Sequence, residues 1–177
     1  MAKGVFLVAA PDLQGPFFRR SVVLIVEYEK NRTSGLIINK PSNHLLSQAL
    51  PGIRQFKNSN QVIFVGGPLM PKIAFLLFKS KEDPGSDAIK IVDNIYFSHK
   101  VSSFSSLKRN HDSKENFRVY SGYSGWKPGQ LEREILMGDW EISAFRPDLI
   151  FDKNPDRIWN DLIREENEVP AGIMARY

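Results

Sequence analysis

The sequence predicts a single α+β domain spanning residues 1–177. Short apolar or β-branched runs, separated by turns rich in glycine, proline and asparagine, recur from residue 5 to residue 122, as expected of strands. Apolar residues at helical spacing lie mainly toward the end of the chain. No repeat, low-complexity segment or linker divides the 177 residues, which are enough to bury one core.

The expected strands differ in how they are covered. In chain order they are Val5–Ala9, Ser21–Glu27, Leu36–Asn39, Val62–Val65, Ile73–Lys79, Ala88–Val92, Ile95–Ser98 and Phe117–Gly122. Ser21–Glu27 is apolar at both parities and is predicted to be covered on two faces. Asn31–Gly35 reads as the turn that follows it. In Phe117–Gly122, Arg118 and Tyr120 are predicted to share one face of the strand.

Four helices are expected, and the last has the strongest signals. They lie at Leu45–Leu50 with Ser42 or Asn43 as cap, near Val101–Arg109, at Pro128–Met137, and at about 155–166. In the last, Asn154 is the expected cap and Pro155 fits the first helical position. Gly138 suits the left-handed turn that ends the third. A polar surface loop is expected at Asn110–Asn116, and the tail 168–177 is expected to fray or to cover a neighbour.

Composition excludes several classes of protein. The absence of cysteine excludes disulfides, thiolate zinc sites and cysteine catalysis. No apolar run approaches the roughly 18 residues that span a bilayer, and Val5–Ala10 is short for a signal peptide. We therefore expect a cytoplasmic protein without a membrane partner.

Positive charge is concentrated in the first half of the chain. Residues 1–89 contain 11 Lys/Arg and 6 Asp/Glu (11 − 6 = +5), and residues 90–177 contain 13 and 14 (13 − 14 = −1). A basic half can favour an acidic partner or nucleic acid. The charges are scattered rather than gathered on one helix, which favours a solvated basic surface over a dedicated DNA-binding face.

The segment Gly122-Tyr-Ser-Gly-Trp126 has a serine between glycines but does not match a hydrolase elbow. That elbow is Gly-x-Ser-x-Gly with a histidine later in the chain, and no histidine follows Ser124. We interpret Ser124 as part of a tight backbone turn. Gly66 and Gly67 follow a strand, but Pro68 removes a donor that a phosphate loop needs, so they are expected to allow close packing. No metal-ligand spacing is present, and neither a metal nor a cofactor is expected.

Two polar groups near apolar strands leave alternatives open. Arg20 and Glu27 flank the strand at 21–27 and can either pair with one another or face a ligand; pairing is commoner near a core. Asn39 ends the next strand and can hold a turn with its side chain. Trp126, like the other tryptophans, is expected to pack, with stacking on a flat ligand as the alternative.

Four blocks of sequence together resemble the AlgH/YqgE family. They are Leu7–Val23, Gly35-Leu-Ile-Ile-Asn-Lys-Pro41, Val65-Gly-Gly-Pro-Leu69 and Gly122-Tyr-Ser-Gly-Trp-Lys-Pro-Gly-Gln-Leu-Glu-Arg-Glu134, in the family's order. The resemblance implies an α+β domain whose bifurcated, mixed or antiparallel sheet folds into a barrel-like body with flanking helices. It also implies a bacterial cytosolic protein of a mostly uncharacterised family, whose label comes from a proposed transcriptional regulator. The family usually has histidine after Glu27, where this chain has Tyr28, which argues against catalysis there.

These observations lead to a non-enzymatic, cytosolic binding or regulatory protein as the first hypothesis, with no catalytic residues assigned. Its ligand or protein partner is unknown, and its contact surface is expected where the candidate residues converge. The candidates are Arg20, Glu27, Asn39, Tyr123, Ser124, Trp126, Gln130 and Glu132. Two alternatives stay open: a DNA-binding transcriptional regulator, and a weak hydrolase using Ser124, Glu27 or Glu132. In the segment 122–135, Pro128 is expected in the first helical turn, with Gln130 reaching back to the helix mouth.

Overall fold

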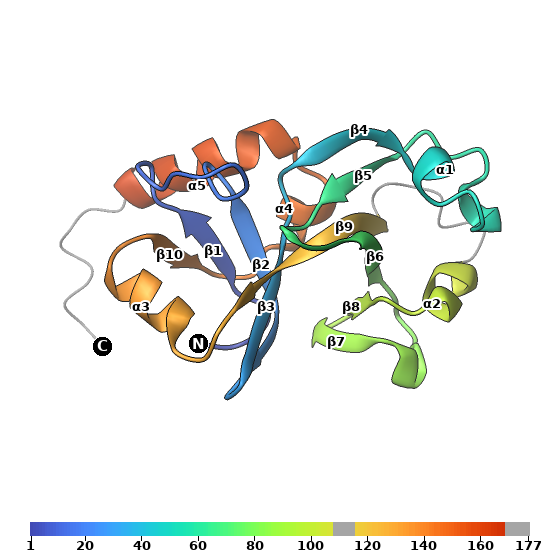
Figure 1. The fold of residues 1–177 in the computed structure, drawn as a ribbon, viewed down its shortest axis with the longest axis horizontal. Helices are drawn as coiled ribbons and strands as arrows, with labels where there is room; N and C mark the ends of the chain where they lie inside the picture. Colours follow the sequence, from blue (N-terminus) through green and yellow to red (C-terminus); the bar gives the residue numbers. More distant parts are fainter. Residues whose placement is uncertain (108–115, 169–177) are drawn as a thin grey trace.

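The computed structural model describes residues 1–107 and 116–168 and confirms an α+β fold (Figure 1). The strands are β1 Phe6–Ala9, β2 Val22–Glu29, β3 Arg32–Ile37, β4 Pro41–Leu45, β5 Val62–Val65, β6 Leu69–Lys79, β7 Ile89–Val92, β8 Ile95–Ser98, β9 Phe117–Trp126 and β10 Trp140–Ser143. The helices are α1 Leu46–Ala49, α2 Val101–Ser106, α3 Gln130–Leu136, α4 Pro147–Phe151 and α5 Pro155–Glu168, with 3-10 turns η1 Arg54–Phe56 and η2 Gly85–Asp87.

All ten strands belong to one sheet that bifurcates at β9. The main path runs β10-β1-β2-β3-β9-β6-β8-β7, and β5 and β4 branch from β9. β9 pairs antiparallel with β6 and β3 and parallel with β5, the one parallel pair among the described strands. Its Phe117–Tyr123 part meets β6, and its Ser124–Trp126 part meets β3. The expected bifurcated sheet is therefore present.

The expected barrel-like closure is wrong. A barrel requires the first and last strands of the sheet to pair, but within the described residues β10 pairs only with β1, and β7 only with β8. The bifurcation at β9 accounts for this. β3 and β5 both pair with this one strand, so the sheet divides at β9 into two wings rather than curving into a ring. One wing contains β10, β1, β2 and β3, and the other contains β4, β5, β6, β7 and β8.

Two hydrophobic clusters form the core, and the larger extends over both wings. It joins β1, β2 and β3 to α4 and α5, where Ile158 and Leu162 are buried, and it continues onto β5, β6, β7, β8 and β9. The smaller cluster lies where β6, β8 and β9 meet α1, η1 and α2, and Phe56 stacks on Phe117 with ring centroids 5.6 Å apart. β2 is buried at both parities over Val22–Val26, as predicted, because side chains of the larger cluster pack against this strand, which β1 and β3 flank within the sheet.

Several element boundaries differ from expectation. The hairpin between β2 and β3 turns at Lys30–Asn31, so Arg32–Gly35, expected as a turn, begins β3. β4, β10 and α4 were not predicted; β4 and β10 have several exposed side chains, and α4 is only five residues long. The cap of α1 is Leu45 rather than Ser42 or Asn43, because β4 occupies those two positions.

The helix ends are mostly as predicted. The Asn154 Oδ1 accepts a hydrogen bond from the Asp156 N–H at 3.1 Å, capping α5, and Gly138 has φ 81° after α3. Pro128 lies outside α3, since Gly129 is the left-handed N-cap with φ 73°. The helix expected to end near Arg109 ends at Ser106. The expected loop at 110–116, apart from Asn116, and most of the tail 168–177 lie outside the described residues.

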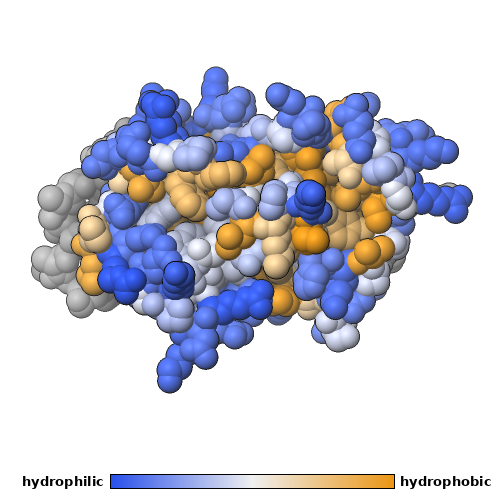
Figure 2. Space-filling model, in the orientation of Figure 1, coloured by the Kyte–Doolittle hydropathy of each residue, from blue (hydrophilic) through white to orange (hydrophobic). Residues whose placement is uncertain are grey.

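The first half of β6 carries apolar side chains on the surface. Leu69, Met70 and Ile73 are 42%, 58% and 44% exposed. Figure 2 shows hydrophobic surface on the part of this face where Figure 1 draws β4, β5 and β6, bordered by hydrophilic side chains. The rest of β6 is half-buried or buried from Ala74 onward, where it pairs with β9 and β8.

Candidate functional site

The two glycine motifs meet where the sheet bifurcates. The Ile37 N–H donates to the Gly66 carbonyl at 2.9 Å, and the Gly66 N–H donates to the Ser121 carbonyl at 2.9 Å. A Cβ on Gly67 would overlap the backbone of Tyr123 and Ser124, and one on Gly122 would lie 2.6 Å from the Gly67 carbonyl oxygen. Only glycine permits this approach of backbone to backbone. The expected close-packing role of Gly66 and Gly67 is confirmed.

Ser124 is part of this junction and lies within strand β9, so its expected place in a tight backbone turn is wrong. Its side chain is fully buried, and its hydroxyl donates to the Gly66 carbonyl at 3.2 Å. Tyr123, one residue earlier, packs edge-on against Phe75 with ring centroids 5.6 Å apart. Both candidate residues therefore have structural contacts that join β9 to β5 and β6.

Asn39 and Arg20 form a second, separate contact. The Asn39 Oδ1 accepts from the Val22 N–H at 2.8 Å, and its Nδ2 donates to the Arg20 carbonyl at 3.0 Å. Both polar atoms of this buried side chain thus fix the backbone where β2 begins, as expected for Asn39. Arg20 has φ 52° and places its guanidinium 5.5 Å from the Trp159 ring centroid on α5.

Glu27 lies in a third place. Its Oε2 accepts from the Ser34 hydroxyl at 2.6 Å and forms an ion pair with the Arg32 Nε at 3.0 Å. The pairing of Glu27 with Arg20 that the sequence suggested is therefore wrong. The cause is the tight hairpin at Lys30–Asn31, which brings the start of β3 beside the end of β2.

Tyr28 faces away from Glu27, because neighbouring strand residues point to opposite faces. Its hydroxyl donates to Glu132 Oε1 on α3 at 2.7 Å. This hydrogen bond is the main cause that lowers the pKa of Glu132 and raises the pKa of Tyr28. Tyr28 thus connects the β2–β3 hairpin to α3.

The strongest polar cluster centres on Glu134, which sequence reasoning left out of the candidates. Its Oε2 accepts from the indole N–H of Trp126 at 2.8 Å and of Trp140 at 2.9 Å. Its Oε1 accepts from Gln130 Nε2 at 2.8 Å. Gln130 Oε1 also accepts from the Lys127 N–H at 3.0 Å, which confirms its expected reach back to the helix mouth. The cluster joins α3 to β9 and β10.

The eight candidates take part in five sets of contacts: the β9 junction, the Asn39 contact, the Glu27 ion pair, the hydrogen bond of Glu132 with Tyr28 and the α3 cluster around Glu134. The Glu27 contact lies beside the β9 junction, because Ser34 pairs with Gly125. Binding of a ligand by any one of them stays a prediction.

The hydrogen bond between Tyr28 and Glu132 gives a testable pH effect. A carboxyl whose pKa is lowered by folding contributes stability above its unfolded pKa and loses it as pH falls through the folded pKa. In Tyr28→Phe we expect the pKa of Glu132 to rise toward its ordinary value, with the fold unchanged. Carboxyl NMR titration measures this directly, and an unmoved Glu132 pKa in the variant would show that the hydrogen bond does not set it.

A groove of about 1500 Å³ lies between the segment leading into β5 and the α4–α5 junction. It is lined by Pro41, Arg54, Gln55, Lys57, Asn58, Ser59, Asn60, Gln61, Val62, Phe64, Arg118, Phe151, Asp152, Lys153, Asn154, Pro155 and Asp156. The charged lining consists of four cations and two carboxylates, giving 4 − 2 = +2. None of the eight candidate residues predicted from the sequence lies in this lining.

Arg118 forms part of the groove and is only 8% exposed. Its Nη2 donates to the Phe151 carbonyl at 3.0 Å, and its guanidinium lies 5.5 Å from the Phe64 ring centroid. Burial lowers the pKa of Arg118, while Tyr120 and Asp152 oppose that shift, and an arginine stays charged throughout the physiological range. A buried cation thus contributes to the groove between β9 and α4.

Tyr120 lies next to Arg118 on the same face of β9, as predicted from the strand's alternation. Its ring packs against Phe64 at 5.8 Å, and its fully buried hydroxyl has no hydrogen-bond partner among the described residues. Burial raises the pKa of Tyr120 strongly, and the charge of Arg118 only partly opposes this. The hydroxyl is therefore neutral in the physiological range.

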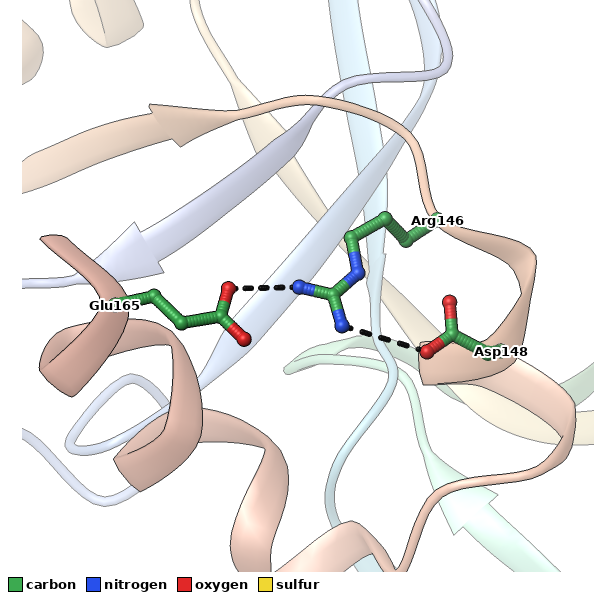
Figure 3. Close-up of polar contacts among 3 residues, drawn as sticks. All are labelled: Arg146, Asp148 and Glu165. Atoms are coloured by element: carbon green, nitrogen blue, oxygen red, sulfur yellow. Dashed lines mark hydrogen bonds and ion pairs between the residues drawn. The ribbon is translucent and has the colours of Figure 1, made fainter.

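An ion-pair cluster holds the α4–α5 side of the groove (Figure 3). Arg146, just before α4, donates to Glu165 on α5 at 2.7 Å and to Asp148 on α4 at 3.4 Å. The short helix α4 is thereby joined to the long helix α5, and the Phe151 carbonyl that accepts from Arg118 lies at the end of α4.

One sequence signal could have indicated this groove. Arginine is almost never buried without a partner, and Arg118 alternates with apolar residues inside a predicted strand. Much of the remaining lining comes from η1 with the segment after it, up to residue 61, and from the connection at 152–154; their proximity depends on β5 pairing with β9 far away in the sequence. No local pattern encodes that pairing.

Among residues 1–107 and 116–168, no three or more acidic or histidine side chains are grouped so as to hold a metal ion. No helix in the same part of the chain combines the length and apolar character needed to cross a membrane.

Comparison with known proteins identifies the family. A family model described as AlgH-like matches residues 6–170. The chain belongs to the AlgH-like family. A UPF0301 protein of Chlamydia trachomatis is 35% identical over 92% of this chain and 85% of its own, and one of Parabacteroides distasonis is 31% identical over 91% and 81%.

Two solved structures have a similar fold. Protein DIP2367 from Corynebacterium diphtheriae has a TM-score of 0.77 and 23% identity, covering 93% of this chain and 87% of that one. The AlgH protein from Pseudomonas aeruginosa has a TM-score of 0.76 and 23% identity, covering 98% and 93%. At this identity the likeness supports the fold and not a function.

Proposed function

We propose that this AlgH-like protein is a non-enzymatic, cytosolic binding protein with a regulatory role, and that its groove binds an anionic ligand. The observation that carries the proposal is Arg118, a buried cation in the groove lining. Taking a charge out of water is costly, and an anion bound in the groove would offset part of that cost. Carbonyl groups and the Phe64 face hold this guanidinium in position, and an anion arriving in the groove would gain from that placement.

Further charges support an anionic ligand. Arg54 and Lys57 lie on one side of the groove and Lys153 on the other, so three exposed cations accompany Arg118. A concave surface with net positive charge concentrates the electrostatic field and therefore attracts anions. Half-buried Val62 supplies apolar area beside the charges, and a mixture of apolar and polar groups is the usual composition of a binding pocket.

The alternatives are less well supported. Direct DNA binding would use the same cations, but Asp152 and Asp156 in the lining would repel a phosphate backbone. A hydrolase using Ser124 would need to expose a hydroxyl that is fully buried and bonded to Gly66. A role for Glu27 or Glu132 in catalysis would have to replace their contacts with Arg32 and Tyr28.

Multivalent anions test the proposal. We expect pyrophosphate and citrate to raise the melting temperature of the wild-type protein, and we expect Arg118→Gln to abolish most of that increase. Because Arg118→Gln can alter the fold, the variant Arg54→Gln/Lys57→Gln, whose residues are exposed, serves as a second probe. Arg32→Gln is the matched control, because Arg32 is an exposed arginine outside the groove lining. Equal stabilisation of all four proteins, or of none, would contradict the proposal.

A further inference from the structure

We infer that the groove accepts an extended, acidic peptide segment of a protein partner. This rests on the proposed function and specifies its ligand. Size is the first argument. Small-molecule sites usually measure about 300–1000 Å³, and this groove has about 1500 Å³. A single small anion at Arg118 would leave most of it filled with water, whereas a chain molecule would occupy its length.

The arrangement of charge favours peptide over nucleic acid. The cations occur at separate places: Arg54 and Lys57 near η1, Arg118 on β9, and Lys153 between the two helices. Asp152 and Asp156 flank Lys153 on the α4–α5 side. A nucleic acid has a charge at every nucleotide and would place phosphates against these carboxylates. A peptide can place carboxylates at chosen positions and leave neutral residues between them.

The neutral lining is also suited to a peptide. Asn58 and Asn60 are exposed on the side that contains η1, and an amide side chain both donates and accepts hydrogen bonds. A peptide backbone presents N–H and C=O groups in alternation, so it can use both functions, while a phosphate only accepts. Val62, which is half-buried, provides apolar contact for a side chain between the acidic ones, while Phe64 and Phe151 are buried beneath the surface of the groove.

Selection from a random peptide library displayed on phage tests the inference without assuming a sequence. Peptides of about ten residues are appropriate, because they span roughly 33 Å when extended. The targets are the full-length wild-type chain, Arg118→Gln, the charge-reversed variant Arg54→Glu/Lys57→Glu and the control Arg32→Gln. We expect peptides of net negative charge to be enriched on the wild type and on the control, and not on the two groove variants.

Affinity of one enriched peptide, labelled with fluorescein, is then measured by anisotropy on the same four proteins, with a labelled oligothymidylate in parallel. We expect the charge reversal to weaken peptide binding at least about tenfold and the control to leave it unchanged. The selection would overturn the inference if no peptides were enriched, or if the enriched peptides were basic or purely apolar. The affinity measurement would overturn it if the charge-reversed variant bound the peptide as tightly as the wild type, or if the oligothymidylate bound more tightly than the peptide. If the peptide experiments fail but citrate and pyrophosphate still stabilise the protein through Arg118, the inference of a peptide ligand is wrong and the proposed function stands. If these anions do not stabilise the protein either, the proposed function is also wrong.

Discussion

Gly67→Ala is expected to prevent the protein from reaching its native stability. The added Cβ would overlap the backbone of both Tyr123 and Ser124, and backbone cannot rotate away as a side chain can. Relieving the overlap means separating β9 from the end of β5, which is where the two wings of the sheet join. Overpacking of this kind costs on the order of 3 kcal/mol, equivalent to a fall in melting temperature of about 6–12 °C for a chain of this size.

Thermal unfolding followed by circular dichroism measures the effect. Gly52→Ala is the matched control, because Gly52 has no neighbouring atom within 4 Å of the added Cβ. We expect the control to change stability by less than about 1 kcal/mol. If Gly67→Ala has the same melting temperature as the control Gly52→Ala, the contact between the two glycine motifs is not required for the fold.

Glu134→Ala is expected to have the second-largest effect. It removes the acceptor for the indole N–H groups of Trp126 and Trp140, which are 7% and 3% exposed, and for Gln130. Leaving a buried donor unsatisfied costs about 1–3 kcal/mol, so we expect a loss of about 3 kcal/mol in the free energy of unfolding. Glu134→Gln keeps one acceptor oxygen and should lose only about 1 kcal/mol.

Urea unfolding monitored by tryptophan fluorescence provides the measurement, since two of the three tryptophans belong to this cluster. Glu141→Ala, at an exposed position on β10, is the control and should change stability by less than about 0.5 kcal/mol. If Glu134→Ala and Glu141→Ala unfold at the same urea concentration, the indole hydrogen bonds contribute nothing measurable.

Features of the fold that depend on local physics were predictable. The double-sided apolar pattern of Ser21–Glu27 predicted a central strand, and Asn154 with Pro155 predicted the start of α5, because capping and burial leave local traces in sequence. The position of Pro128 was mispredicted because Gly129 takes the left-handed conformation before the helix begins. β10 was missed because a four-residue edge strand with one buried side chain carries little pattern.

The candidate site was less predictable for a physical reason. Tyr28 and Glu132 are 104 residues apart in sequence, and Arg118 meets the Phe151 carbonyl 33 residues away. Such contacts depend on strand order, which local periodicity does not encode. The motif residues that attracted notice, Gly67 and Ser124, mark close backbone packing rather than a place for a ligand.

The central claim is that the groove containing Arg118 is where this protein binds its ligand. The most direct measurement is amide chemical-shift mapping of the full-length, isotope-labelled protein titrated with an acidic peptide enriched on the wild type. We predict that the shifts gather at 54–64, Arg118 and 151–156, and that residues of the α3 cluster around Glu134 stay unchanged. Shifts gathered at the first half of β6 or at α3, with the groove residues unmoved, would contradict the claim.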